Sequence, residues 1–270
     1  MGRLRLVALT RSIGIGLAFV LGAVHVISGP RAAWARRMGL AAIVVVACGL
    51  TVTPWAVRNW VRLHAFVPVS TDFGRNLYAG WVSVPDEKIF GGGPDDETSR
   101  YAQTIDSEVA RDRFLQQQAV AFIRTHPALI PRYLFLKTLY FWSPLDWDVM
   151  GHGEGTYNGV YVALFPFVLF VAWLARRRAP LAVWLCVSTV AYFWAVVLLG
   201  SATPRYRYPL EPMMMLLAGC GLVAFFADAA NRRARMSIAV PWLLANLVAI
   251  AYSHEVKGAM SMALSRVGIW

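Results

Sequence analysis

Hydrophobic residues fall into two blocks along this chain, and a long polar segment separates them. The apolar blocks cover residues 13–56 and 157–252, whereas most of segment 57–156 is compatible with water. The polar segment holds 12 of the 15 acidic and 10 of the 26 basic residues, so its formal charge is −2 and that of the rest is +13. A helix needs ~20 mainly apolar residues to cross a bilayer, and each block is long enough for two or more. The pattern therefore predicts membrane helices around one large hydrophilic insert.

Six apolar stretches within the blocks predict the individual spans. Backbone groups find no water to bond with in lipid, so each span is expected to be a helix. The predicted spans are 13–29, 39–56, 157–175, 181–201, 212–228 and 238–253. The expected fold class is an all-α polytopic membrane protein with about six transmembrane helices and a mainly helical extracytoplasmic insert. Its expected parts are the first two spans at 1–56, the insert at 57–156, and a four-helix block with a short tail at 157–270.

Arginines beside the spans indicate the orientation of the chain. If the insert lies outside the cytoplasm, the short cytoplasmic loops contain nine arginines, and the outer loops and termini contain seven arginines and lysines. Cytoplasmic loops of membrane proteins are the richer in these residues, so the count places the insert outside. The same clusters account for the formal net charge of +11, because beside apolar runs they meet anionic headgroups. We therefore expect membrane lipid as a partner, and no nucleic acid.

The first half of the insert predicts a loop and a helix. Residues 85–99 combine glycine and proline with five acidic residues, which is typical of a mobile loop. Asp106 or Ser107 can cap a helix that runs to about Thr125, where Pro127 stops further winding. Closer to the membrane, residues 66–70 predict a short strand or an extended stretch.

The second half of the insert predicts an amphipathic helix over residues 128–142. Leu129, Tyr133, Leu136 and Tyr140 recur at the spacing of one helix face. Aromatic residues at its carboxyl end are typical of a helix that lies at the level of the lipid headgroups.

Arginines at the edge of the predicted bundle are the first candidates for chemistry. Arg58 follows the second span, and Arg205 and Arg207 lie in the loop before the fifth. Burying a charge at a membrane edge is costly, so these groups need a partner, and a guanidinium grips a phosphate with two hydrogen bonds. The alternative is that they only extend to the headgroups and anchor their helices. Tyr206 and Tyr208 are candidates for packing on a lipid or a sugar.

Acidic residues of the insert offer two further hypotheses. Asp72 is a candidate general base, and its alternative role is that of a turn residue. A cluster before the third span could instead bind a divalent cation, although a solvated loop has the same composition. The cluster consists of Asp146, Asp148, His152 and Glu154.

Several segments together resemble a family of bacterial membrane glycosyltransferases. The family comprises the dolichyl-phosphate-mannose–protein mannosyltransferases and the aminoarabinose transferases, which share the GT-C fold. The resemblance extends from about residue 7 to residue 228 and depends on the order and spacing of short motifs. The matching segments are Leu9-Thr10-Arg11, Thr53–Asn59, Phe66–Thr71, Gly74–Gly80, Ala119–Pro127, Lys137 with Phe141–Pro144, and Arg205–Pro212.

The resemblance implies an enzyme that takes a sugar from a polyprenyl-phosphate carrier at the outer face of a bacterial inner membrane. It implies a role in binding the phosphate of the donor for Arg58, Arg205, Arg207 and Lys137. Members of the family carry catalytic acidic residues in a loop after their first span, and that loop has no counterpart here. We therefore expect a chain that corresponds to the carboxyl-terminal part of such an enzyme, with no catalytic base carried over.

Two other functions are consistent with the sequence. The missing loop favours a non-catalytic membrane partner, or a degenerate or split glycosyltransferase that pairs with a second chain supplying the absent helices. A transporter or flippase is the other alternative. Transporters place polar groups at the middle of the membrane and often contain internal repeats. The acidic residues near the predicted spans, Glu211 and Asp228, lie at span ends, and no repeat is evident.

Overall fold

The computed structural model describes most of the chain as helices. The described residues are 13–82, 97–142, 145–146, 156–157, 159–178, 180–201, 206–227 and the short stretches 236–237, 239–244 and 247. The chain forms two compact units. The first consists of Met1–Val84, Gly93–Ile130 and Val187–Ser201, and the second of Pro85–Gly92, Pro131–Cys186 and Ala202–Trp270. These units are defined by which segments pack together. They therefore do not test the three parts predicted from hydropathy, 1–56, 57–156 and 157–270.

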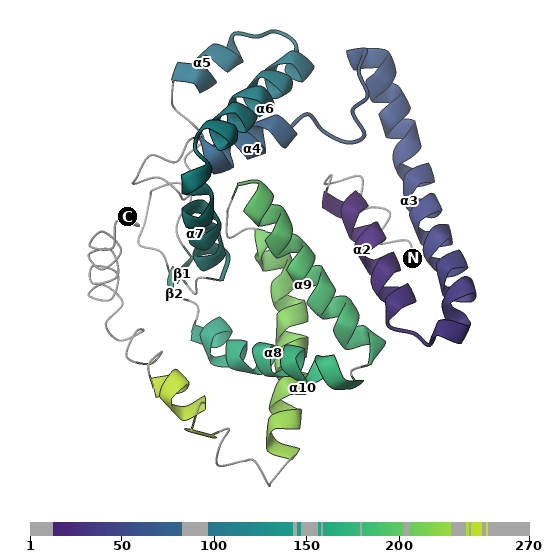
Figure 1. Ribbon diagram of the computed structural model, residues 1–270, viewed down its shortest axis with the longest axis vertical. Coiled ribbons are helices and arrows are strands. Elements are labelled where there is room, and N and C mark those ends of the chain that lie inside the picture. Colours follow the sequence, from purple (N-terminus) through teal and green to yellow (C-terminus); the bar gives the residue numbers. More distant parts are fainter. Residues whose placement is uncertain are drawn as a thin grey trace. The chain divides into compact units, whose positions relative to one another are not determined.

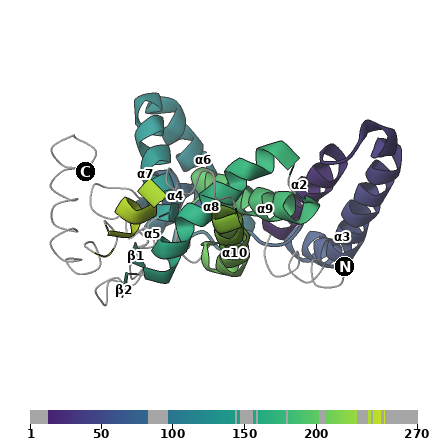
Figure 2. The same cartoon turned by 90° about the horizontal axis from the view of Figure 1, so that it is seen from below.

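The first unit begins with a hairpin of two apolar helices. Helix α2 covers Ile13–Ile27, and after the short 3-10 helix η1 (Arg31–Ala33) helix α3 covers Trp34–Leu63. The two helices lie side by side in both Figure 1 and Figure 2. Ala18 of α2 packs against Cys48 and Val52 of α3, because small side chains there let the helix backbones approach each other.

Helix α3 is longer than the span predicted at 39–56. The predicted span ends at residue 56, and the helix itself continues through Pro54 to Leu63. A proline inside a helix has no N–H to donate to the carbonyl four residues earlier, which for Pro54 is that of Leu50. The preceding residue, Thr53, donates through Oγ1 to the Gly49 carbonyl at 2.8 Å. The helix ends where His64 takes a left-handed conformation with a φ of 49°.

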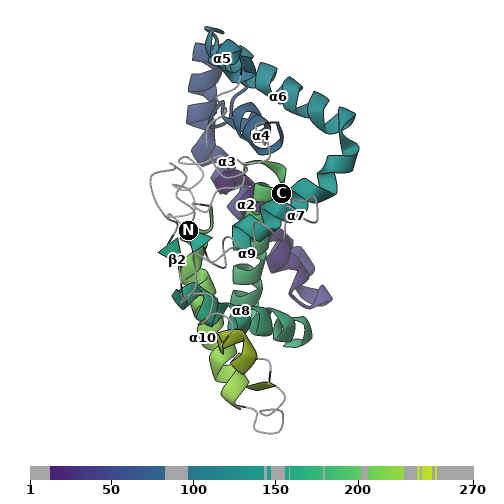
Figure 3. The same ribbon diagram turned by 90° about the vertical axis from the view of Figure 1, so that its left-hand side faces the viewer.

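Three shorter helices complete the first unit together with part of α9. They are α4 (Phe73–Trp81), α5 (Glu97–Gln103) and α6 (Glu108–Thr125), and α4 packs beside α6 (Figure 3). Their core contains Tyr78, Ala102, Leu115 and Ala119. The Trp81 indole donates to the Leu199 carbonyl of α9 at 2.8 Å, which ties α4 to the end of that helix.

Sequence reasoning missed α4 and placed the start of α5 in a loop. Glycine has low helix propensity, but Gly74 and Gly80 both lie inside α4, where the backbone of another segment comes close. A Cβ atom on Gly80 would collide with the carbonyl oxygen of Gly200. Helix α5 starts at Glu97, within the loop predicted at 85–99, while residues 83–96 lie outside the described part of the chain.

Helix α6 confirms its sequence prediction. Its cap is Ser107, whose Oγ accepts a hydrogen bond from the Ala110 amide at 3.3 Å, and it ends at Thr125 before Pro127. The next predicted helix is also present, as the 3-10 helix η2 (Pro127–Leu129) followed by α7 (Ile130–Trp142). At 66–70, where the sequence predicts a short strand or an extended stretch, the backbone is irregular and forms no strand.

The second unit is built around two apolar helices. Helices α8 (Gly159–Arg178) and α10 (Glu211–Ala227) pack on each other and cross in Figure 1. Phe167 of α8 and Phe225 of α10 stack edge to face, with ring centroids 5.5 Å apart. A 3-10 helix, η4 (Tyr208–Leu210), leads into α10, and two-residue strands β1 (Leu145–Asp146) and β2 (Thr156–Tyr157) pair antiparallel. Helix α9 (Leu181–Leu199) follows α8 and has its later part in the first unit.

Three of the described helical stretches are long and apolar enough to cross a membrane. They are Arg31–Leu63, Leu181–Leu199 and Tyr208–Ala227. Two shorter stretches, Gly14–Ile27 and Val160–Val171, are also apolar. Helices are therefore present at five of the six predicted spans, and the sixth, 238–253, lies largely outside the described residues. The number of membrane crossings stays a prediction.

Candidate functional site

Arg58 sits on the exposed surface of α3, in a position fixed by two neighbouring side chains. Its guanidinium carbon lies 4.6 Å from the centre of the Trp55 ring, and its Nη1 donates to Asn59 Oδ1 at 3.0 Å. Both partners are held by the following segment, because Trp55 Nε1 donates to the Val69 carbonyl and Asn59 Nδ2 to the Val67 carbonyl, each at 2.9 Å. The irregular stretch 66–70 thus supplies the acceptors that orient the side chains around Arg58.

This arrangement orients the Arg58 guanidinium and leaves the residue exposed. The stacking and the hydrogen bond restrict the rotamers of a long side chain, so less entropy is lost when it binds a ligand. A guanidinium carries five N–H donors in a planar fork, and Asn59 accepts from one of them. Sequence reasoning missed Asn59, although a buried amide after a run of apolar residues is a usable signal.

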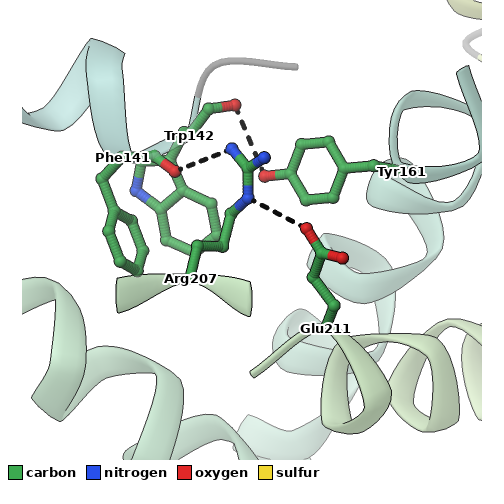
Figure 4. Close-up of polar contacts among 5 residues, drawn as sticks. All are labelled: Phe141, Trp142, Tyr161, Arg207 and Glu211. Carbon is green, nitrogen blue, oxygen red and sulfur yellow. Dashed lines mark hydrogen bonds and ion pairs between the residues drawn. The ribbon is translucent and has the colours of Figure 1, made fainter. Parts of the chain in front are cut away.

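A second arginine, Arg207, lies completely buried in the second unit (Figure 4). Its side chain is 0% exposed. Its Nε contacts Glu211 Oε1 at 3.4 Å, its Nη1 donates to the Phe141 carbonyl at 3.2 Å, and its guanidinium carbon lies 4.5 Å from the centre of the Tyr161 ring. The Tyr161 hydroxyl donates to the Trp142 carbonyl at 3.4 Å. A lipid phosphate could reach this guanidinium only if these contacts opened.

These contacts join the ends of three helices. Phe141 and Trp142 are the last residues of α7, where carbonyl groups lack partners within the helix. Arg207 and Tyr161 donate to those carbonyls, while Glu211 lies in the first turn of α10. Positive charge is favourable at a helix carboxyl end and negative charge at an amino end, so the ion pair suits both helices. We call Arg207, Glu211, Tyr161 and the carboxyl end of α7 the Arg207 clasp.

Lys137 lies on α7 one turn before the clasp. It is four residues before Phe141, so the two side chains share a face of the helix, and Lys137 is only 3% exposed. Burial disfavours the charged form and lowers the pKa of the Lys137 amino group to about 7. The second unit therefore brings two of the predicted phosphate-binding cations, Lys137 and Arg207, onto elements that touch at the clasp.

The tyrosines predicted to contact substrate flank Arg207. Tyr208 is 44% exposed and Tyr206 is half-buried. Arg205 lies outside the described residues, as do Asp148, His152 and Glu154 of the predicted cation site, and only the backbone of Asp146 is described. Within the described part of the chain, no group of three or more histidine, cysteine or acidic side chains is arranged to hold a metal ion.

Asp72 precedes α4 and is exposed, and a second acid, Asp112, lies close to it. Asp112 Oδ1 on α6 accepts hydrogen bonds from the backbone amides of Gly74 at 2.7 Å and Arg75 at 3.2 Å. Burial raises the pKa of the Asp112 carboxyl, the two backbone hydrogen bonds oppose this, and the charge of Asp72 adds to the increase. Asp112 thus fixes the start of α4 and with it the position of Asp72. Sequence reasoning missed Asp112, since its partners are 37 and 38 residues away.

An apolar groove of about 500 Å³ is lined by residues of α2 and α3 and by Phe66 and Pro68. Its α3 wall includes Gly49 and Ala56. Arg58 is two residues beyond Ala56, which places it about 200° around the helix at about 100° per residue. The groove and Arg58 are therefore on opposite sides of α3 and do not form one site. Because Arg58 and Arg207 belong to different units, the predicted convergence of the arginines stays a prediction.

Comparison with known proteins gives no match to a protein-family model, a curated protein or a solved structure.

Proposed function

We propose that this chain is a multi-pass protein of the bacterial inner membrane that uses Arg58 to hold the phosphate of a polyprenyl-phosphate-linked sugar. Its place in the reaction is that of a glycosyltransferase, or the carboxyl-terminal portion of one. The observation that supports this proposal is the oriented, exposed guanidinium of Arg58, which directly follows the uncharged stretch 38–57 of α3. Six spans, with the insert 57–156 at the outer face, are part of the same proposal.

The length of α3 supports a position for Arg58 at the membrane surface. Residues 38–57 carry no charge, and Arg37 and Arg58 bracket them. At about 1.5 Å per residue these arginines are about 31 Å apart along the helix, close to the ~30 Å thickness of the hydrocarbon core. Trp34 at one end and Trp55 and Trp60 at the other suit the two interfacial belts. Leu50, which is 68% exposed two turns before Arg58, offers an apolar surface for a lipid chain.

The chemistry requires an anion-binding group and a base. In the proposed reaction the bond between the anomeric carbon and the phosphate oxygen breaks, the acceptor hydroxyl or amine forms a new bond to that carbon, and the polyprenyl phosphate leaves. A guanidinium at the phosphate stabilises the charge of the leaving group. The acceptor also loses a proton, and we propose the Asp72 carboxylate as the group that takes it. A divalent cation at Asp146 and its neighbours remains a further hypothesis.

Lipid binding by two arginine variants tests the proposal. Arg58→Ala removes the stacked guanidinium, whereas Arg62→Ala removes another exposed arginine of the same helix, one turn further on. We expect Arg58→Ala to weaken the binding of a polyprenyl phosphate in nanodiscs by about tenfold or more, and Arg62→Ala to change it little. Equal binding by Arg58→Ala and the unmodified chain would refute the proposal.

A non-catalytic partner of a second chain is the alternative, and the burial of Arg207 favours it. One of the predicted phosphate ligands is taken up by contacts within the protein, which leaves fewer groups for catalysis. An assay of the purified chain separates the two functions. The chain is placed in proteoliposomes with a polyprenyl-linked sugar and a mixed pool of acceptors, and the release of polyprenyl phosphate is measured. Release of polyprenyl phosphate by this chain alone supports the enzyme. If this chain binds the lipid but releases polyprenyl phosphate only when a second chain is added, the result supports the non-catalytic partner.

A further inference from the structure

The Arg207 clasp connects the end of α7 with two apolar helices through one buried side chain. Arg207 is 0% exposed and contacts Glu211, the Phe141 carbonyl and the face of Tyr161 (Figure 4). An arginine cannot lose its proton to escape the cost of burial, so a buried guanidinium persists only where its contacts compensate that cost. We propose that Arg207 is a positioning residue that fixes the carboxyl end of α7 and thereby keeps Lys137 out of water.

The role needs the shape of arginine as well as its charge. The planar group stacks on Tyr161 and at the same time directs Nε and Nη1 toward different partners. A lysine ammonium is a compact charge. It does not stack on a ring as a planar guanidinium does, and it lacks two N–H groups fixed toward two different partners. Tyr161 belongs to the clasp through its ring and also through its hydroxyl, which donates to the Trp142 carbonyl.

Aromatic packing adds to the clasp at the same end of α7. The Trp142 ring lies 5.3 Å from that of Phe165 on α8, and Tyr161 lies 5.5 Å from Phe165 in turn. The Arg207 side chain is 0% exposed and stacks on the Tyr161 ring, where an unpaired charge is costly, whereas the Glu211 side chain is 20% exposed. Removing one partner should therefore release the end of α7, while helices elsewhere in the chain stay folded.

Lys137 reports the state of the clasp because it lies one turn away on the same face. Lys137 is 3% exposed when the clasp is closed. Opening of the last turns of α7 would bring water and reagents to that group. The inference is independent of the proposed lipid binding, since every measurement below uses lipid-free protein in detergent.

Two measurements on the purified full chain test the clasp. Backbone hydrogen exchange of residues 134–142 reports on α7, and exchange of residues 110–123 in α6 serves as the internal reference. Acylation of the Lys137 amine, followed by mass spectrometry, reports its access to solvent. We expect Arg207→Met to raise both the α7 exchange rate and the acylation rate by about tenfold or more, with α6 unchanged. The matched control, Arg113→Met on the exposed side of α6, should change neither rate.

Milder variants keep the test decisive if Arg207→Met does not fold. Glu211→Gln removes the charge of the partner, and Tyr161→Phe keeps the ring but removes the hydroxyl, so each should raise α7 exchange by a few-fold. Arg207→Lys should show the same fast α7 exchange as Arg207→Met, because lysine lacks the planar set of guanidinium N–H donors. Unchanged α7 exchange and acylation in Glu211→Gln and Tyr161→Phe would overturn the proposal. An equal rise in α6 and α7 would do the same, since it indicates general loosening.

Discussion

At the scale of single residues, burial divides cations that look alike in the sequence. Arg58, Lys137 and Arg207 were all predicted to meet a lipid phosphate, yet only Arg58 is exposed. The sequence could not show this, because Arg207 takes one of its partners from Phe141, which lies 66 residues earlier. The contacts of Arg58 are local, with Trp55 and Asn59 on the same helix, and its exposure follows from its place at the end of an apolar run.

Replacement of Lys137 predicts a stability effect that depends on pH. The pKa of Lys137 is about 7 in the folded chain, below the ordinary lysine value of 10.5, so the folded state binds fewer protons than the unfolded state between these values. The free energy of unfolding should therefore rise with pH from about 7 to about 10.5, and the penalty is fully present below pH 7. We expect Lys137→Met to be more stable than the parent chain at pH 6, by on the order of a few kcal/mol, and the difference to vanish near pH 10.5.

Thermal unfolding in detergent at a series of pH values measures this difference. Lys137→Arg is the informative control, because arginine stays charged throughout the range and should destabilise the chain at every pH. A stability difference between Lys137→Met and the parent that does not change with pH would contradict the lowered pKa of Lys137.

At the scale of elements, local signals predicted helices well and long-range packing decided the rest. The cap at Ser107 and the stop at Pro127 were sufficient to place α6, since both act within one turn. Helix α4 was not foreseen, because Gly74 and Gly80 have low helix propensity on their own. The backbone of Asp112 in α6 lies close to Gly74, and that of Gly200 after α9 lies close to Gly80, so neither position has room for a side chain. These neighbours are far away in the sequence, so local sequence patterns could not reveal them.

The contact of α4 with Asp112 predicts a local effect of substitution. Asp112→Ala leaves the amides of Gly74 and Arg75 without their acceptor, so the first turn of α4 should loosen. We expect faster hydrogen exchange in residues 73–78 and a loss of about 1 kcal/mol in the free energy of unfolding. Asp112→Asn, which keeps an acceptor oxygen, should show a smaller change. Exchange in α4 that is the same in all three chains would contradict the role of Asp112.

The composition of α3 also makes a prediction at this scale. Val46 lies near the middle of the uncharged stretch 38–57 and is 59% exposed. If that stretch spans the bilayer, Val46→Arg places a charge at its centre, at a cost of about 2.5–3.5 kcal/mol for insertion. We expect a fraction of the Val46→Arg chains to fail to insert, measured by carbonate extraction of membranes, while Val46→Leu inserts as the parent does. If Val46→Arg resists carbonate extraction as fully as Val46→Leu does, the charge costs nothing at this position, and α3 does not lie in the hydrocarbon core.

At the scale of the whole molecule, hydropathy predicts where helices lie but not how the charged groups of distant segments meet. Five of the six predicted spans coincide with described helices, since apolar runs of that length have few alternatives. The two compact units, in contrast, draw on segments far apart in the sequence, and α9 contributes to both. Which cations share a site depends on that assembly. The resemblance already implied that Arg58, Lys137 and Arg207 bind one phosphate, whereas the link of Lys137 with Arg207 through α7, and the place of Arg58 in the other unit, came from the structure.

The orientation of the whole chain is the prediction on which the proposed outer-face chemistry depends. Arg100 on α5 is exposed within the insert, and Pro180 is exposed in the connection between α8 and α9. In a chain with its three native cysteines replaced by alanine, Arg100→Cys should react with a membrane-impermeant thiol reagent in intact cells, and Pro180→Cys only after the cells are opened. The reverse result would place the insert and Arg58 in the cytoplasm. The difference between nine and seven basic residues is small enough to be compatible with that orientation. Arg58 would then face the cytoplasmic leaflet, and the lipid phosphate it holds would belong to a carrier loaded on that side.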